Sequence, residues 1–76
     1  MTQREEIKAA KKGIYGGLLV AYLSLKNIED STLSLLHLQK TEDGYENISD
    51  FLGEIKGIKL RLEKIERTYP EVCKND

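Results

Sequence analysis

The apolar residues of this chain recur at alternating steps of three and four over two long stretches, which is the pattern of an amphipathic helix. The first stretch consists of Ile7, Ala10, Ile14, Leu18, Ala21, Leu25 and Ile28. Thr2 and Glu5 precede it with the spacing of a capping box, in which the threonine caps the helix. We therefore predict a helix over residues 3–26, with Asn27 as a left-handed terminator.

The segment after Asn27 is less regular. Asp30 and Ser31 are suited to cap a short second helix over residues 32–40. The leucines at 33, 35, 36 and 38, however, fit neither the helical nor the strand period. An alternative layout makes strands of residues 18–25 and 32–39, so the sequence leaves residues 18–39 open between helix and β-hairpin. A turn is predicted at Asp43-Gly44.

A third helix is predicted from a cap at Asn47, with Asp50 as the weaker capping-box partner. Its apolar residues form an a/d heptad series typical of a coiled coil: Ile48, Phe51, Ile55, Ile58, Leu62, Ile65 and Tyr69. The helix is expected to stop at Tyr69-Pro70, because a residue before proline avoids helical geometry. Residues 70–76 are expected to form a loose tail.

These elements predict one all-α domain over residues 1–76, built as a helical hairpin or a three-helix bundle. The alternative is an α+β fold with a two-stranded hairpin between two helices. A domain of this size buries only about 60% of its unfolded surface. Leu19 and Leu23 point away from the stripe that contains Leu18 and Leu25, so this half of the first helix is apolar all round. We therefore expect self-association, as a homodimer, or a partner to complete the core.

Two glycine pairs at helical spacing need an explanation, because a helical glycine costs about 0.5–1 kcal/mol relative to alanine. Gly13 and Gly17 border the apolar stripe of the first helix, together with Ala10 and Ala21. A strip of small side chains beside a core stripe lets another helix approach closely. We expect these four residues to serve the internal packing of the fold.

The second pair, Gly53 and Gly57, lies behind the heptad series with Leu60. Two interpretations remain open. These residues are either tolerated surface positions or a second, flatter contact face for a partner. Under the second interpretation, a Gly57→Leu substitution abolishes partner binding and leaves helicity intact.

Charge and chemistry narrow the function classes. The chain has 13 Asp and Glu residues against 12 Lys and Arg residues, which argues against nonspecific nucleic-acid binding. A local basic cluster of Lys8, Lys11 and Lys12, followed by Tyr15, nevertheless keeps a small dimeric nucleic-acid-binding regulator as the alternative function.

No motif of an enzyme or a cofactor site is present in the sequence. His37 is the only histidine and Cys73 the only cysteine, so neither a metal site nor a disulfide within one chain is expected. The glycine-rich segment 12–17 lacks the Gly-Lys-Ser/Thr end of a phosphate loop. The longest apolar run, residues 18–23, is short for a membrane span, and a cytoplasmic location is expected.

The sequence thus favours a small protein–protein interaction module that docks by a helix face. Inhibitors, immunity and antitoxin proteins and small phage regulators act in this way, by covering a partner's surface. Candidate anchors are Tyr15, Leu19, Tyr22 and Leu23, because aromatic residues are enriched at binding hot spots.

Overall fold

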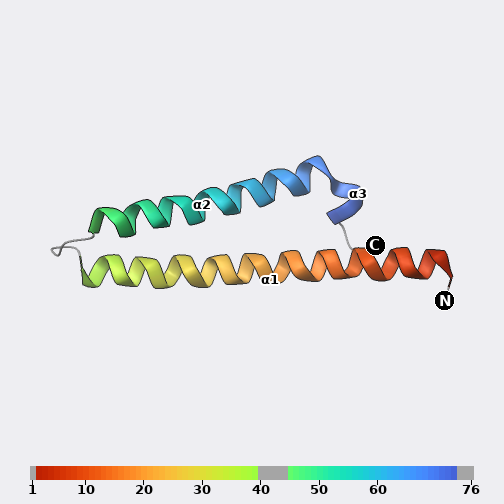
Figure 1. Ribbon diagram of the computed structural model, residues 1–76, viewed down its shortest axis with the longest axis horizontal. Coiled ribbons are helices and arrows are strands. Elements are labelled where there is room, and N and C mark those ends of the chain that lie inside the picture. The colour runs from red at the N-terminus through yellow and green to blue at the C-terminus, as the bar shows by residue number, and fades with distance from the viewer. Residues whose placement is uncertain (1, 40–44, 74–76) are drawn as a thin grey trace.

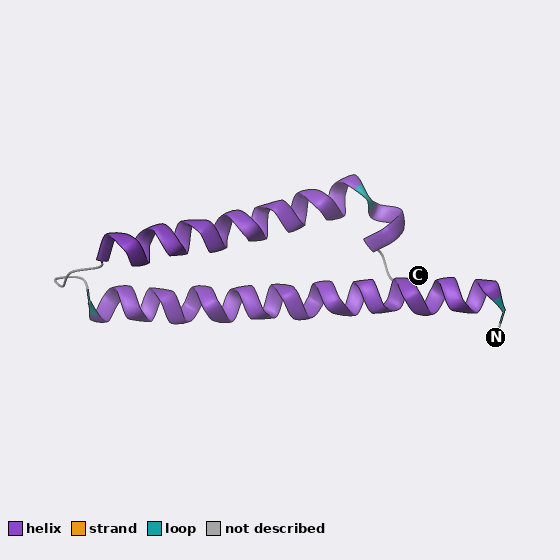
Figure 2. Ribbon diagram, viewed as in Figure 1, coloured by secondary structure: helices purple, strands orange, loops and turns teal. Residues whose placement is uncertain are grey.

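The computed structural model describes residues 2–39 and 45–73. Two long antiparallel helices, α1 (Gln3–Leu38) and α2 (Tyr45–Thr68), form a hairpin, and the short helix α3 (Pro70–Cys73) folds back onto α1 (Figures 1 and 2). No strand occurs in the described parts of the chain. The all-α prediction is confirmed as a helical hairpin, and the α+β alternative is wrong.

Helix α1 begins where the sequence predicts. Thr2 is its N-cap, and the threonine hydroxyl accepts a hydrogen bond from the backbone N–H of Glu5 at 3.2 Å. The predicted break at Asn27 is wrong. Helix α1 continues without interruption to Leu38, so the predicted second helix is the last part of α1. Thr32 illustrates how a residue with capping character is accommodated inside α1: its hydroxyl donates to the carbonyl of Ile28 at 2.6 Å.

Helix α2 begins at Tyr45, so Asn47 lies in its first turn and is not the cap that was predicted. The turn expected at Asp43-Gly44 lies outside the described residues. At the other end the prediction is confirmed, since α2 ends at Thr68 and Pro70 opens α3. Of the expected loose tail, Pro70–Cys73 is helical and Cys73 is buried.

The hairpin is long and thin. Its principal extents are 59 × 21 × 13 Å and its radius of gyration is 17.3 Å. A compact domain of this length has a radius of gyration of about 11 Å. Part of the difference comes from α1, whose first turns extend past the end of the hairpin at α3 (Figure 1).

Very little of the described chain is buried. The only residues classed as buried are Leu25, Thr32, Leu52, Ile55 and Cys73, and no side chain is fully enclosed. Two helices in contact along one seam shield only one side of each other. The hairpin therefore leaves most of its apolar side chains accessible.

Candidate docking face

The seam between α1 and α2 is rotated from the one that the heptad pattern predicts. On α2 the buried residues are Leu52 and Ile55, and Ile48 and Leu62 are half-buried. Phe51, Ile58, Ile65 and Tyr69 were expected in the same seam but are exposed. The helices thus meet on the positions called a and e in heptad notation, and the d positions are left uncovered.

A hydrogen bond between side chains at e positions crosses the seam. The Tyr22 hydroxyl donates a hydrogen bond to the Glu66 carboxylate across the two helices. Burial of the ring raises the pKa of Tyr22 from 10.0 to about 12, and the hydrogen bond and the negative charge of Glu66 add to that shift. Tyr22 was predicted as a docking anchor, but its hydroxyl serves the internal seam of the hairpin.

The d positions of both helices are apolar, and together we call them the apolar face. Its members are Ile7, Ile14, Ala21, Ile28 and Leu35 on α1, and Phe51, Ile58 and Ile65 on α2. All are seven residues apart within their helix, so each set forms a stripe along one side. The large members are 37–51% exposed.

Both stripes lie on the same side of the hairpin. Leu35 and Phe51 line one groove of about 320 Å³, together with Thr32, Asn47 and Ile48. The contact between Tyr22 and Glu66 sets the same antiparallel register at the other end. Because both helices rise about 1.5 Å per residue, this register aligns the apolar face in layers. The three layers are Leu35 with Phe51, Ile28 with Ile58, and Ala21 with Ile65.

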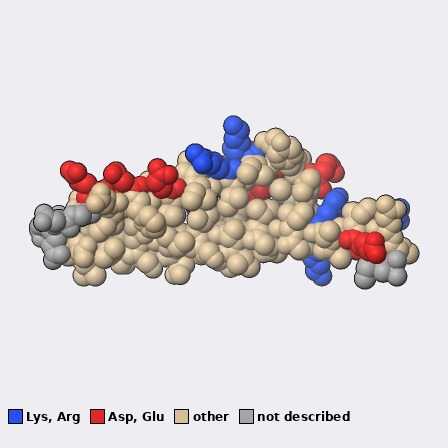
Figure 3. All heavy atoms as spheres, in the orientation of Figure 1, with Lys and Arg blue, Asp and Glu red and all other residues tan. Residues whose placement is uncertain are grey.

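A charged row borders the apolar face on α2. It consists of Asp50, Glu54, Gly57, Arg61 and Lys64, which follow one another at steps of four and three and therefore lie on one side of the helix. The row is acidic before Gly57 and basic after it. Figure 3 shows the change: red side chains lie near the start of α2 and blue side chains follow towards its middle.

Between Ala10 and Ser31 the matching border on α1 carries no charge. The residues at the corresponding positions are Ala10, Gly13, Gly17, Val20, Ser24, Asn27 and Ser31. Most of these side chains are small. The apolar face is therefore bounded by a smooth edge on α1 and by a charged edge on α2.

The remaining predicted anchors lie elsewhere. Leu19 and Leu23 are exposed on α1, on the other side of the seam from the apolar face. Tyr15 lies on the seam side of α1, seven residues before Tyr22, and is 36% exposed. Leu60 and Gly53 are exposed on the outer side of α2. The structure does not bring these residues together with the apolar face.

The glycines have open space around them. A methyl group added at Gly13, Gly17, Gly53 or Gly57 would meet no atom of the described residues within 4 Å beyond the local helix. The close internal packing expected at Gly13 and Gly17 is therefore not found among residues 2–39 and 45–73. These positions are accessible to a second molecule.

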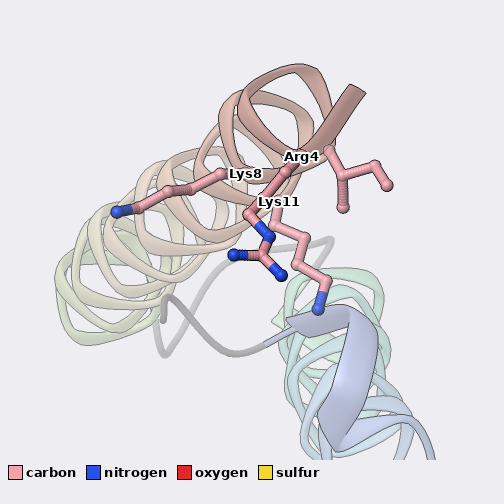
Figure 4. Close-up of a pocket in the computed structure, with 4 residues that line it drawn as sticks. Arg4, Lys8 and Lys11 are labelled. Atoms are coloured by element: carbon pink, nitrogen blue, oxygen red, sulfur yellow. The ribbon is translucent and has the colours of Figure 1, made fainter. Parts of the chain in front are cut away.

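The protruding end of α1 carries a small basic hollow of about 240 Å³, lined by Arg4, Ile7, Lys8 and Lys11. Arg4 and Lys11 extend towards the side on which α3 lies, whereas Lys8 extends away from it (Figure 4). This hollow is the part of the structure that corresponds to the basic cluster seen in the sequence.

The apolar face was not predicted as an exposed surface, although a seven-residue repeat in the sequence indicates it. The series Ile7, Ile14, Ala21, Ile28 and Leu35 repeats every seven residues without interruption across the predicted break at Asn27. An unbroken heptad is evidence for one long helix with a seam along it.

No protein-family model matches this chain, and neither a curated protein nor a solved structure matches it. Within residues 2–39 and 45–73, no group of three or more His, Cys, Asp or Glu side chains is placed to hold a metal ion. None of the described helices combines the length and apolar character needed to cross a membrane.

Proposed function

We propose that this chain is a small, non-enzymatic protein–protein interaction module that acts by docking its apolar face, and that a second copy is the first occupant of that face. A regulatory role in the cytoplasm, such as that of an inhibitor, an immunity or antitoxin-like protein or a phage-type regulator, fits a module of this kind. The two seven-residue stripes of half-exposed apolar side chains carry the proposal.

The accessible surface supports docking quantitatively. The chain exposes 6222 Å². A compact monomer of 8.7 kDa exposes about 4,700 Å² by the usual scaling with mass. The excess is about 1,500 Å², whereas each partner in a standard interface contributes about 800 Å². The hairpin thus has more than enough surplus surface to form a stable contact with a second helical hairpin.

Two matched substitutions on α2 test this face. Ile58 lies in the central layer of the apolar face and is 42% exposed, whereas Leu60 lies on the outer side of α2 and is 63% exposed. Ile58→Lys and Leu60→Lys make the same chemical change on two sides of one helix. Circular dichroism checks that both variants retain their helicity, and sedimentation velocity measures the dissociation constant of the dimer.

We expect Ile58→Lys to weaken the dimer at least about tenfold, because Ile58 is 42% exposed in the hairpin and each of the two copies loses about 0.6–1.3 kcal/mol of further burial. Leu60→Lys is expected to leave the dissociation constant within about threefold of the parent value, since exposed surface substitutions usually change stability by less than 0.5 kcal/mol. Equal affinities in both variants would remove the apolar face as the docking surface. Dissociation in Leu60→Lys alone would assign docking to the outer face.

The second candidate function is a small dimeric nucleic-acid-binding regulator. It is favoured by the hollow that Arg4, Lys8 and Lys11 line at the protruding end of α1. Fluorescence anisotropy with a labelled DNA duplex and with single-stranded RNA tests it. The function requires binding that weakens steeply with salt and is lost in Arg4→Glu/Lys8→Glu. No binding at low salt would eliminate it.

A further inference from the structure

We infer that the second copy packs antiparallel on the apolar face and forms a four-helix bundle in which α1 meets α1 and α2 meets α2. This inference rests on the proposed docking function and adds the orientation and register of the pair. The twofold axis passes through the central layer, between the two copies of Ile28 and the two copies of Ile58.

The charged row on α2 selects this orientation. Its acidic and basic halves are arranged symmetrically around Gly57, with Glu54 three residues before it and Arg61 four residues after it. When α2 runs antiparallel to its copy, Glu54 lies opposite Arg61 of the second copy, and Asp50 lies opposite Lys64 of the second copy. Each pair occurs twice by symmetry. The row therefore complements itself only when the two α2 helices run in opposite directions.

The apolar layers agree with the same axis. In this arrangement the central layer of Ile28 and Ile58 meets itself. The layer of Ala21 and Ile65 meets the layer of Leu35 and Phe51 of the second copy. Along α1 the small Ala21 side chain thereby faces the larger Leu35 side chain of the second copy, which is the alternation that fills a core evenly. On α2, the charge pairs place the axis next to Gly57 and the apolar layers place it at Ile58, so the two positions differ by no more than one residue.

The uncharged border of α1 fits this arrangement too. Ser24, Asn27 and Ser31 lie beside the apolar stripe of α1. Small side chains let α1 approach its copy closely. No charge on this border opposes a like charge when the border faces itself.

The other way to join the two apolar faces places both hairpin turns at the same end. Each α2 then faces α1 of the second copy. Glu54 then lies against Ser31 and Arg61 against Ser24, and neither charge finds an opposite charge on the facing border. That orientation buries a similar surface but leaves the charged row unused.

Distances between spin labels distinguish the two orientations. Single cysteines are introduced as Ala9→Cys and Lys26→Cys in a Cys73→Ser background, since both positions are exposed and neither belongs to the apolar face. Circular dichroism and sedimentation confirm that the labelled variants fold and associate as the parent does. Double electron–electron resonance then measures the distance between the two labels of a dimer.

Antiparallel packing places the Lys26 labels near the axis and the Ala9 labels far from it. With 1.5 Å of rise per residue, we expect about 57 Å between the Ala9 labels and less than about 30 Å between the Lys26 labels. Distances below about 30 Å at both positions would overturn the antiparallel orientation and leave the docking function standing. A protein that stays monomeric would contradict the docking function itself.

A charge exchange gives an independent measurement. Glu54→Arg alone is expected to raise the dissociation constant of the dimer about threefold to tenfold, because it replaces two attractive pairs by two repulsive ones. Adding Arg61→Glu to the same chain restores the pairs and is expected to restore the affinity. A double variant that is weaker than the single variant would overturn the pairing of Glu54 with Arg61.

Discussion

Replacement of Gly16 and Gly53 by alanine is expected to stabilise this protein. Both glycines lie inside helices, Gly16 in α1 and Gly53 in α2. In the part of the chain that the structure describes, a methyl group at either position would meet no atom within 4 Å beyond the local helix. Neither position lies on the apolar face, so a second copy bound there does not fill the space. The substitutions therefore act on the backbone alone.

The expected gain follows from helix propensity. Alanine is favoured over glycine in a helix by about 0.5–1 kcal/mol per position, chiefly because glycine loses more conformational freedom on folding. The two sites are on different helices, so their effects should add to about 1–2 kcal/mol. For a domain of this size 1 kcal/mol corresponds to about 4–8 °C in melting temperature.

Thermal and urea unfolding followed by circular dichroism measure the gain in the parent, the two single variants and the double variant. All samples are compared at one protein concentration, since association makes the melting temperature depend on concentration. An unchanged or lower melting temperature in either single variant would contradict the claim that the space around that glycine is open. It would show instead that the position contacts another molecule.

Three further predictions concern the cap, the seam and the core. Thr2→Ala should speed hydrogen exchange at the Glu5 amide, because losing the cap costs about 1 kcal/mol locally. The melting temperature should stay constant, because this turn protrudes from the hairpin (Figure 1). A fall of several degrees in the melting temperature would contradict that. The parent protein should lose unfolding free energy at alkaline pH as the Tyr22 hydroxyl deprotonates, and Tyr22→Phe should lack this loss. The stabilisation by protonated Tyr22 is complete below its unfolded pKa of 10.0 and disappears as the pH rises through the folded pKa of about 12. Urea unfolding of the parent and of Tyr22→Phe from pH 9 to 12 tests this, and an equal decline of the unfolding free energy in both proteins would count against it. Leu52→Ala should cost about 2–3 kcal/mol in urea unfolding, whereas Leu60→Ala, on the exposed side of α2, should change stability by less than about 0.5 kcal/mol; similar losses would contradict the observed seam.

Helix type and the ends of the hairpin were predictable because local chemistry determines them. Thr2 caps α1 through its own hydroxyl, and Pro70 cannot continue α2. The break predicted at Asn27 failed for a physical reason. Asparagine, aspartate and serine favour helix ends but cost only a few tenths of a kcal/mol inside a helix. Burial of Leu25 and Thr32 on both sides of that point outweighs this cost.

The rotation of the seam was not predictable from hydrophobic periodicity. The pattern on α2 assigns Phe51 and Ile58 to the seam, because they are apolar and correctly spaced. The structure instead uses Leu52 and Glu66 beside Ile55, and Glu66 binds Tyr22 of α1. A cross-helix hydrogen bond between residues 44 positions apart leaves no trace in local periodicity.

The role of the glycines also depended on tertiary structure. Their helical spacing indicates a close contact, but only the structure shows that no described part of the same chain makes that contact. Gly57 then stands between the acidic and basic halves of the charged row on α2. From the sequence alone, Gly57 was either a tolerated surface position or part of a partner site. It lies at the centre of the proposed pairing of the two α2 helices.

The mass of the unmodified chain in solution tests the central claim most directly. Light scattering coupled to size exclusion, run over a series of loading concentrations, distinguishes one copy of 8.7 kDa from two. Docking of a second copy on the apolar face gives twice the chain mass at high concentration, with dissociation on dilution. A mass of one chain at every concentration would contradict the claim that a second copy covers the apolar face.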